Sequence, residues 1–99
     1  MAVGVQFDFR GRTLEQYDQS MERVGLLPGG PPPRGQVFHV AMKTDDGVRC
    51  IDVWESREKF ENFWETRILP SVQEGGVVDP PEIQIFEVHN YLVGSRSRG

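Results

Sequence analysis

The chain has 99 residues, of which 37 % are hydrophobic and 26 % charged, and its formal net charge is -4. This length is that of a single domain, which can bury enough surface to form a core without disulfides or metals. The acidic balance argues against a nucleic-acid partner, because such a protein needs a basic face to neutralise phosphates. The sequence contains no apolar run of about 18 residues, so we expect no membrane partner and no membrane span.

Cysteine and histidine are scarce in this chain. The single cysteine, Cys50, excludes a disulfide within the chain, which favours a cytoplasmic location. The first residues lack a basic segment followed by a long apolar stretch, so we expect no signal peptide. One cysteine and two histidines are too few for a zinc site built from these ligands, and no motif indicates another cofactor. We therefore expect no metal and no cofactor.

The first half of the chain predicts a strand, a helix and a loop. Residues 2–9 alternate between apolar and polar side chains, which is typical of a strand. Thr13 and Gln16 have the spacing of a capping box, which predicts the start of a helix that ends at Gly25. Three consecutive prolines within residues 28–35 predict a loop, since they are compatible with neither a helix nor a central strand.

The second half predicts a hairpin, a second helix and a last strand. Strands over 37–43 and 48–55 flank a Thr-Asp-Asp-Gly turn, whose Asp-Gly pair favours a tight hairpin. Ser56 caps a helix that kinks or restarts at Pro70 and closes at the Gly-Gly pair that follows. Residues 83–93 form the last predicted strand.

The order of predicted elements is β-α-β-β-α-β. This order predicts a ferredoxin-like α+β fold, with a four-stranded antiparallel sheet, strand order 4-1-3-2, and both helices on one face. We expect one domain over residues 1–93 and a disordered polar tail over 94–99.

The predicted hairpin brings His39 opposite Asp52. Pairing across the turn gives these two residues adjacent positions, with Cβ atoms about 5 Å apart. A slip of one residue would send them to opposite faces of the sheet. The other face of the hairpin is more apolar, so we expect it to pack on the helices. By the same reasoning, further inward side chains are those of Phe86, Val88 and Leu92 in the last strand and Val3, Val5, Phe7 and Phe9 in the first.

The face without helices is then predicted to carry the functional site. It would collect Gln6, Asp8, His39, Cys50, Asp52, Trp54, Ile83, Ile85, Glu87, His89 and Tyr91. One alternative is that this face is only hydrated, and that the His39–Asp52 pair contributes at most about 1 kcal/mol. The aromatic and aliphatic side chains beside this pair argue for a covered pocket or an interface instead.

The candidate catalytic residues are His39, Asp52 and His89. A carboxylate beside an imidazole holds one tautomer and raises its basicity, which suits a general base near neutral pH. His89, together with Tyr91 and Glu87, could supply a second acid or polarise a carbonyl. The alternatives are a hydrogen bond that only stiffens the hairpin and an edge strand that carries ordinary polar residues.

The remaining candidates bind substrate. Trp54 serves equally as a stacking wall for an aromatic molecule or as an anchor at an interface. With Tyr91 and Glu87, the residues Cys50 and Gln6 complete the predicted binding set. Cys50 is expected to act as a small buried side chain and not as a nucleophile, because no nearby cation lowers its pKa. The aromatic residues of the second helix are expected only to fill the core.

The run Val-Trp-Glu-Ser-Arg-Glu-Lys-Phe at 53–60, preceded by the Thr-Asp-Asp-Gly hairpin, resembles the dimeric α+β barrel superfamily. The resemblance covers about residues 2–93 and is closest to the branch of antibiotic-biosynthesis monooxygenases and small polyketide cyclases. It implies a homodimer, in which two ferredoxin-like subunits pack sheet against sheet, and a pocket for a hydrophobic small molecule.

The resemblance also bears on the site. The monooxygenases of this branch oxidise polycyclic aromatic polyketides without metal or flavin, and their motif tryptophan, matched by Trp54, belongs to the active site. Cys50 stands where they have asparagine, and Phe60 stands where they have tyrosine. The cyclases and isomerases of the superfamily use His, Tyr or acidic residues as acid and base.

Three functions remain open on this basis. The leading hypothesis is a small cofactor-independent enzyme that performs acid–base chemistry, as a cyclase, isomerase or lyase, on an aromatic or polyketide-like molecule. In it, His39 moves the proton and Asp52 orients His39. The first alternative is a cofactor-free monooxygenase of the antibiotic-biosynthesis type. The second is a non-catalytic ligand-binding or structural dimer, in which His39→Ala would change only stability.

Overall fold

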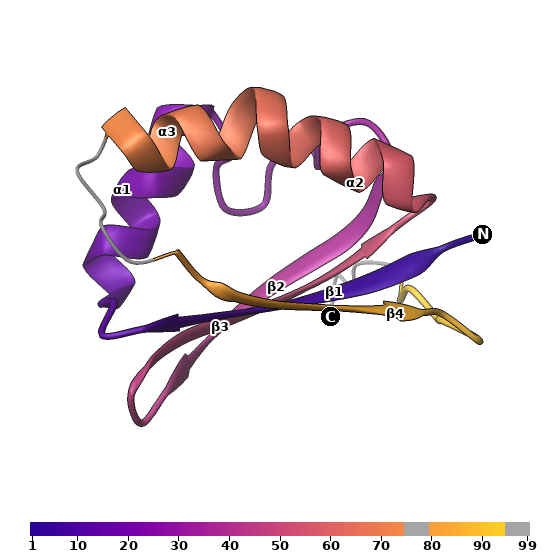
Figure 1. Ribbon diagram of the computed structural model, residues 1–99, viewed down its shortest axis with the longest axis horizontal. Helices are drawn as coiled ribbons and strands as arrows, with labels where there is room; N and C mark the ends of the chain where they lie inside the picture. Colours follow the sequence, from indigo (N-terminus) through magenta and orange to yellow (C-terminus); the bar gives the residue numbers. More distant parts are fainter. Residues whose placement is uncertain (75–79, 95–99) are drawn as a thin grey trace, which may run out of the picture.

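The computed structural model describes residues 1–74 and 80–94, with side chains described for 1–71 and 80–94. The four strands form one antiparallel sheet in the order β2-β3-β1-β4, and the helices cover one of its faces (Figure 1). This arrangement confirms the predicted ferredoxin-like α+β fold and its strand order. The elements are β1 (Val3–Arg10), α1 (Leu14–Val24), β2 (Gln36–Thr44), β3 (Gly47–Trp54), α2 (Arg57–Phe63), the π-helix η1 (Trp64–Ile68), α3 (Leu69–Glu74) and β4 (Glu82–Glu87).

The helix ends follow the local signals in the sequence. Thr13 Oγ1 accepts a hydrogen bond from the Gln16 N–H at 3.1 Å, and Gln16 Oε1 accepts one from the Thr13 N–H at 3.0 Å. Gly25 ends α1 with φ +77°, a left-handed conformation that glycine adopts without strain. Ser56 Oγ accepts from the Lys59 N–H at 3.2 Å and so caps α2. No helix in the described ranges is long and apolar enough to cross a membrane.

The second helical run changes its hydrogen-bonding pattern shortly before Pro70. The Leu69 N–H donates to the Trp64 carbonyl, five residues back, so that one π-turn joins α2 to α3. Pro70 has no N–H and cannot donate to the carbonyl of Thr66, which explains why the regular α-helical ladder is interrupted here. The predicted closure at the Gly-Gly pair lies outside the described residues.

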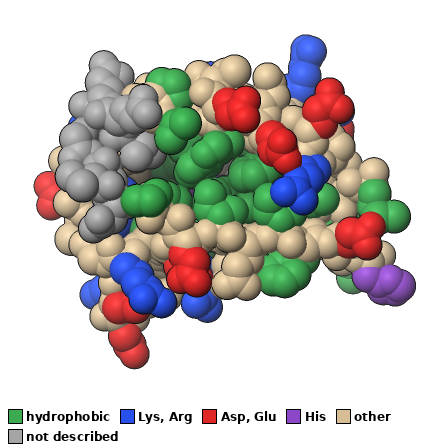
Figure 2. Space-filling view, in the orientation of Figure 1, with side chains coloured by type: hydrophobic (Ala, Val, Ile, Leu, Met, Phe, Trp, Pro, Cys, Tyr) green, Lys and Arg blue, Asp and Glu red, His purple; other side chains and the backbone are tan. Residues whose placement is uncertain are grey.

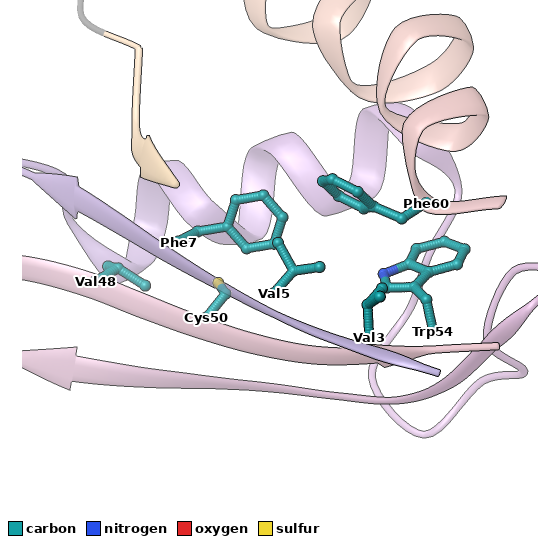
Figure 3. Packing of buried hydrophobic residues seen from close by; sticks show 7 residues of the cluster. All are labelled: Val3, Val5, Phe7, Val48, Cys50, Trp54 and Phe60. Carbon is teal, nitrogen blue, oxygen red and sulfur yellow. The ribbon is translucent and has the colours of Figure 1, made fainter. Parts of the chain in front are cut away.

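The core lies between the sheet and the helical layer. Figure 3 shows its buried side chains projecting from β1 and β3 toward α2, with Phe60 above them. Trp54 is 0 % exposed, and the Phe7 ring stacks on the ring of Trp64 with centroids 5.5 Å apart. The prediction that Val3 and its alternate neighbours on β1 face the helices is therefore confirmed.

The predicted faces of β2, β3 and β4 are wrong. The ladder pairs Val5 with Asp52 on one side and with Ile85 on the other, so both partners share the helical face of the sheet with Val5. His39 pairs with Asp52 and lies on that face as well. Phe86 pairs with Gly4 on the opposite face and is 55 % exposed.

The error has a physical reason. We ranked the two faces by apolar content, but this sheet is apolar on both faces, and Val40, Met42 and Phe86 remain exposed on the one without helices. A polar pair can be buried under helices when hydrogen bonds satisfy it, as they do here. Apolar content alone therefore could not identify the covered face.

The last strand is shorter than predicted. β4 ends at Glu87, where its partner Val3 begins β1, and one further hydrogen bond joins the Val88 N–H to the Ala2 carbonyl at 3.0 Å. Beyond that point β1 offers no further residue with which β4 could pair. Leu92, which we expected to point inward, is 89 % exposed. Of the predicted tail, residues 95–99 lie outside the described part of the chain.

Candidate active site

A cavity of about 680 Å³ lies between the sheet and the helical layer. Its volume is in the range of cavities that hold small molecules. On the face of the molecule seen in Figure 2, apolar side chains gather in a hollow between these two layers. The described lining residues of the cavity are largely apolar, and they include Phe7, Phe9, Val48, Phe60, Phe63, Trp64, Ile68 and the three consecutive prolines Pro31, Pro32 and Pro33.

Three polar side chains on the cavity wall form a hydrogen-bonded chain, which we call the relay. The Tyr17 hydroxyl lies 2.6 Å from His39 Nε2, and His39 Nδ1 lies 2.5 Å from Asp52 Oδ1. Tyr17 comes from α1, His39 from β2 and Asp52 from β3. All three line the cavity.

The hydrogen bonds determine where the imidazole carries its proton. An ionised carboxylate can only accept, so the proton on Nδ1 of His39 is donated to Asp52. In the neutral ring Nε2 is then an acceptor, and it receives the O–H of Tyr17. This tautomer leaves the basic nitrogen of His39 on the side of Tyr17.

Asp52 is held by two further donors. Its side chain is 7 % exposed, and its Oδ2 atom accepts from Gln36 Nε2 and from Trp54 Nε1, each at 3.2 Å. Three donors therefore surround one buried carboxylate. Such an arrangement stabilises its negative charge and fixes its orientation toward His39.

A β-bulge at Val37 allows this arrangement. Gln36 pairs with Trp54 and Phe38 pairs with Val53, so one extra residue lies between two neighbouring pairs of the ladder. In a regular strand, residues 36 and 39 would point to opposite faces of the sheet. The bulge turns both side chains toward Asp52, as bulges near functional sites commonly do. Trp54 is therefore paired with Gln36 and not with Val37, which a ladder continued regularly from the His39–Asp52 pair would place opposite it.

Tyr17 is the member of the relay that sequence reasoning did not identify as functional. Its spacing is typical of the inner side of α1, where filling the core is the simplest interpretation of an aromatic ring. Burial raises the pKa of its hydroxyl above the ordinary value of 10.0, and the nearby Cys50 and Asp52 act in the same direction. The available signal was a polar atom on a face expected to be apolar, since a buried tyrosine hydroxyl needs a partner.

Cys50 lies beside the relay and lines the cavity. It is 3 % exposed, and burial raises the pKa of its thiol to about 12, with a smaller contribution from the charge of Asp52. The thiol is therefore protonated at neutral pH and a poor nucleophile. This agrees with its predicted role as a small buried side chain.

The two tryptophans have the opposite of their predicted roles. Trp54 is fully buried beneath the cavity wall and is absent from the described lining, so its indole reaches Asp52 and not the cavity. Phe60, Phe63 and Trp64, which we expected only to fill the core, line the cavity. The aromatic wall thus comes from α2 and the π-turn.

Four other predicted site residues lie away from the cavity. Gln6 is on the face of β1 without helices, where its amide donates to Asp8 at 3.2 Å. Glu87 is exposed at the end of β4, and His89 and Tyr91 are exposed beyond it, with Tyr91 at 44 %. The structure does not bring them to His39. Gln6 lies on the predicted face, but His39 and Asp52 lie on the other one, and the strand that was predicted to carry His89 and Tyr91 ends at Glu87.

The described residues contain no group of three or more His, Cys, Asp or Glu side chains placed to hold a metal ion. Tyr17, His39 and Asp52 are hydrogen-bonded to one another, and a chain of this kind can pass a proton along its length.

Comparison with known proteins finds solved structures of similar fold. No protein-family model and no curated protein matches the chain. The crystal structure of SnoaB, a cofactor-independent oxygenase from Streptomyces nogalater, is similar, with 16 % identity, a TM-score of 0.55, and coverage of 92 % of this chain and 94 % of that chain. An asparagine-to-alanine variant of SnoaB has 17 % identity and a TM-score of 0.58 over the same shares of both chains. This likeness concerns the fold: the chain and SnoaB share one α+β architecture, which agrees with the fold that the sequence resemblance implied.

Proposed function

We propose that this chain is a cofactor-independent monooxygenase, which removes a proton from a hydrophobic aromatic molecule in the cavity and lets the deprotonated molecule react with O2. The observation that carries the proposal is the relay of Tyr17, His39 and Asp52 on the wall of an apolar cavity. The likeness in fold to SnoaB, a cofactor-independent oxygenase, supports O2 as the second reactant.

The relay defines a path for the proton. The substrate transfers a proton from an acidic O–H or C–H group to the Tyr17 oxygen, while the proton of Tyr17 moves to Nε2 of His39. Asp52 stabilises the resulting imidazolium. The raised pKa of Tyr17 disfavours a free tyrosinate, so His39 is the base and Tyr17 conducts the proton to it.

The cavity suits the reaction that follows. A carbanion in apolar surroundings is poorly solvated and electron-rich, and it can reduce O2 directly. At an activated CH2 group the first product is a hydroperoxide, which carries one hydrogen of the CH2 group on carbon. Loss of that hydrogen with cleavage of the O–O bond gives a ketone and water. One oxygen atom enters the substrate, and the other leaves as water with both hydrogens.

A second candidate is a cyclase or isomerase that uses the same base without O2. It is favoured by Cys50 and Phe60, which stand where the resemblance would place the asparagine and tyrosine of the monooxygenases. In this case the carbanion attacks a carbonyl within the same molecule or is protonated at another carbon. Both candidates require the relay and differ only in the fate of the carbanion.

The proposal is tested with anthrone, a tricyclic ketone with an acidic central CH2 group. Under argon in D2O, catalysed exchange of this CH2 group measures proton removal alone. In air, an oxygen electrode and the absorbance of the quinone measure oxidation, and one O2 should be consumed per quinone formed. Exchange without O2 uptake would favour the cyclase or isomerase. If neither exchange nor O2 uptake is detected, a non-catalytic ligand-binding protein is the remaining function.

We also propose that the functional form is a homodimer that uses the face of the sheet without helices. Val40, Met42 and Phe86 are 38 %, 39 % and 55 % exposed on this face. Monomeric proteins seldom leave such an apolar sheet face in water, and a second copy presents the same surface. Because the cavity lies on the opposite side of the sheet, each subunit would hold its own hydrophobic ligand.

A further inference from the structure

We infer that Ser71 is a second polar anchor of the cavity and binds a carbonyl or hydroxyl oxygen of the substrate. The inference rests on the proposed function, because it describes the ligand of the same cavity. It defines the substrate as a flat aromatic molecule that bears an acidic group for the relay and a separate oxygen for Ser71.

The state of the Ser71 hydroxyl is the first support. Ser71 is 9 % exposed and lines the cavity, and its Oγ atom has no hydrogen-bond partner among the described residues. Serines within helices commonly donate to the carbonyl four residues back, and Ser71 does not. Native proteins rarely leave a buried hydroxyl without a partner, so an unpaired one that faces a cavity points to a ligand.

The surroundings of Ser71 are the second support. On the same helical run the cavity is lined by the apolar side chains of Phe63, Trp64 and Ile68. Within the described part of this run, the Ser71 hydroxyl is therefore a polar group beside an apolar stretch of wall. It can both donate and accept, so it suits a ketone or phenol oxygen.

The charges of the lining favour a neutral ligand. Asp18, Glu22 and Asp52 line the cavity, with Arg12 as the cation among the described lining residues. The Arg12 guanidinium lies over the ring of Phe9, with 5.3 Å from its central carbon to the ring centroid. An excess of acidic groups disfavours a carboxylate substrate, whereas a neutral polycyclic ketone or phenol meets no repulsion.

Binding of two matched probes tests the inference. Anthrone carries its ketone across the central ring from its acidic CH2 group, and anthracene has the same three rings without oxygen. Both are titrated under argon by equilibrium dialysis, with the bound probe measured by its ultraviolet absorbance. We expect the wild type to bind anthrone more tightly than anthracene. Ser71→Ala should weaken anthrone binding about fivefold to tenfold and leave anthracene binding unchanged.

Two controls separate this role from a structural one. Ser71→Thr retains a hydroxyl and should keep the preference for anthrone. Ser71→Ala removes an unpaired buried hydroxyl, so we expect its Tm to rise by about 4 °C, whereas loss of a structural serine would lower it. A lowered Tm, or an equal change in affinity for both probes, would overturn the inference. So would the absence of any effect on anthrone, or a wild type that binds neither probe.

The proposed function is judged independently by deuterium exchange and O2 uptake of the wild type and a His39 variant. If anthrone binding depends on Ser71 but no turnover is detected, the proposed enzymatic function is refuted and the role of Ser71 in binding is supported. If Ser71→Ala changes neither the turnover of anthrone nor the affinity for it, only the proposed role of Ser71 is refuted.

Discussion

The side chain of His39 makes both of its ring hydrogen bonds within the protein. Nδ1 is held by Asp52 at 2.5 Å, and Nε2 faces the hydroxyl of Tyr17 at 2.6 Å. With both nitrogens engaged, the ring cannot rotate without breaking two bonds. An imidazole held in this way keeps its lone pair aimed at the Tyr17 oxygen, which is the geometry that the proposed proton transfer requires.

Replacement of His39 tests the base directly. We expect His39→Gln to lower kcat/KM for anthrone by 10²- to 10⁴-fold, because positioned general bases typically contribute this much. Tyr17→Phe keeps the proposed base but removes the hydroxyl that passes the proton to it, so we expect a smaller decrease in kcat/KM, about tenfold. Deuterium exchange of the anthrone CH2 group under argon measures both. If His39→Gln exchanges the CH2 hydrogens of anthrone at the wild-type rate, the relay takes no part in the chemistry.

Trp54 provides a second test at this scale. It donates to Asp52 but does not line the cavity, so we expect Trp54→Phe to leave the Kd of anthracene within twofold of the wild type. The lost donor and the smaller ring should destabilise the fold by about 1–3 kcal/mol. Urea unfolding and probe titration measure the two effects. Trp64→Ala is the matched control and should weaken binding, since its ring forms part of the wall.

At the scale of single elements, two irregularities shape the site. The bulge at Val37 turns Gln36 and His39 toward the same carboxylate, and the π-turn before Pro70 carries Trp64 and Ile68 along the cavity wall. A regular strand would place only one of these two polar side chains beside Asp52. The remaining helix ends and turns follow ordinary capping signals and were predictable from the sequence.

The pair of β1 and β3 carries an ion pair whose effect depends on pH. Arg49 Nε donates to Asp8 Oδ1 at 2.7 Å, and this hydrogen bond, partly offset by burial, holds the pKa of Asp8 below its usual value of 3.8. A depressed pKa in the folded state stabilises the fold above the unfolded pKa, and this stabilisation is lost as the pH falls through the folded pKa.

We therefore expect Asp8→Asn to destabilise the protein by at most about 1 kcal/mol at pH 7, and by less at pH 2.5, because the stabilisation declines once the pH falls below the usual value of 3.8. Urea unfolding of both proteins at the two pH values measures the difference. A destabilisation of equal size at both pH values would show that Asp8 acts through packing or hydrogen bonding alone.

At the scale of the whole molecule, the sheet is a two-sided apolar layer. One side closes the cavity with the helices, and the other exposes Val40, Met42 and Phe86. A second copy packed on the exposed side would bury these side chains and leave both cavities open to ligand. The proposed homodimer therefore accounts for an apolar surface that the chain leaves uncovered by its own helices.

A single charged substitution on this face tests the proposed interface. We expect Met42→Glu to convert the protein to a monomer, with about half the native mass in light scattering, because a buried unpaired carboxylate is strongly disfavoured. Leu14→Glu is the matched control, since Leu14 is an exposed apolar residue, at 45 %, on the helical layer. Its dimer should persist. A wild type that is already monomeric at micromolar concentration would refute the proposed interface.

The sequence alone determined the order of the elements, the helix caps, the fold class and the pairing of His39 with Asp52. These features depend on periodicity, capping and turn chemistry, which act over a few residues. The length of the last strand was not predictable in this way, because it depends on where β1 begins and leaves β4 without a partner.

Only the tertiary structure decided which face of the sheet the helices cover, and with it the environment of the site. Both faces are apolar, so the choice depends on how β1, β3 and the helical layer fit together as one core. That packing brings Tyr17 from a distant helix to His39 and moves Trp54 behind Asp52. Contacts between segments so far apart in the chain have no local signal, because each element alone is compatible with either orientation.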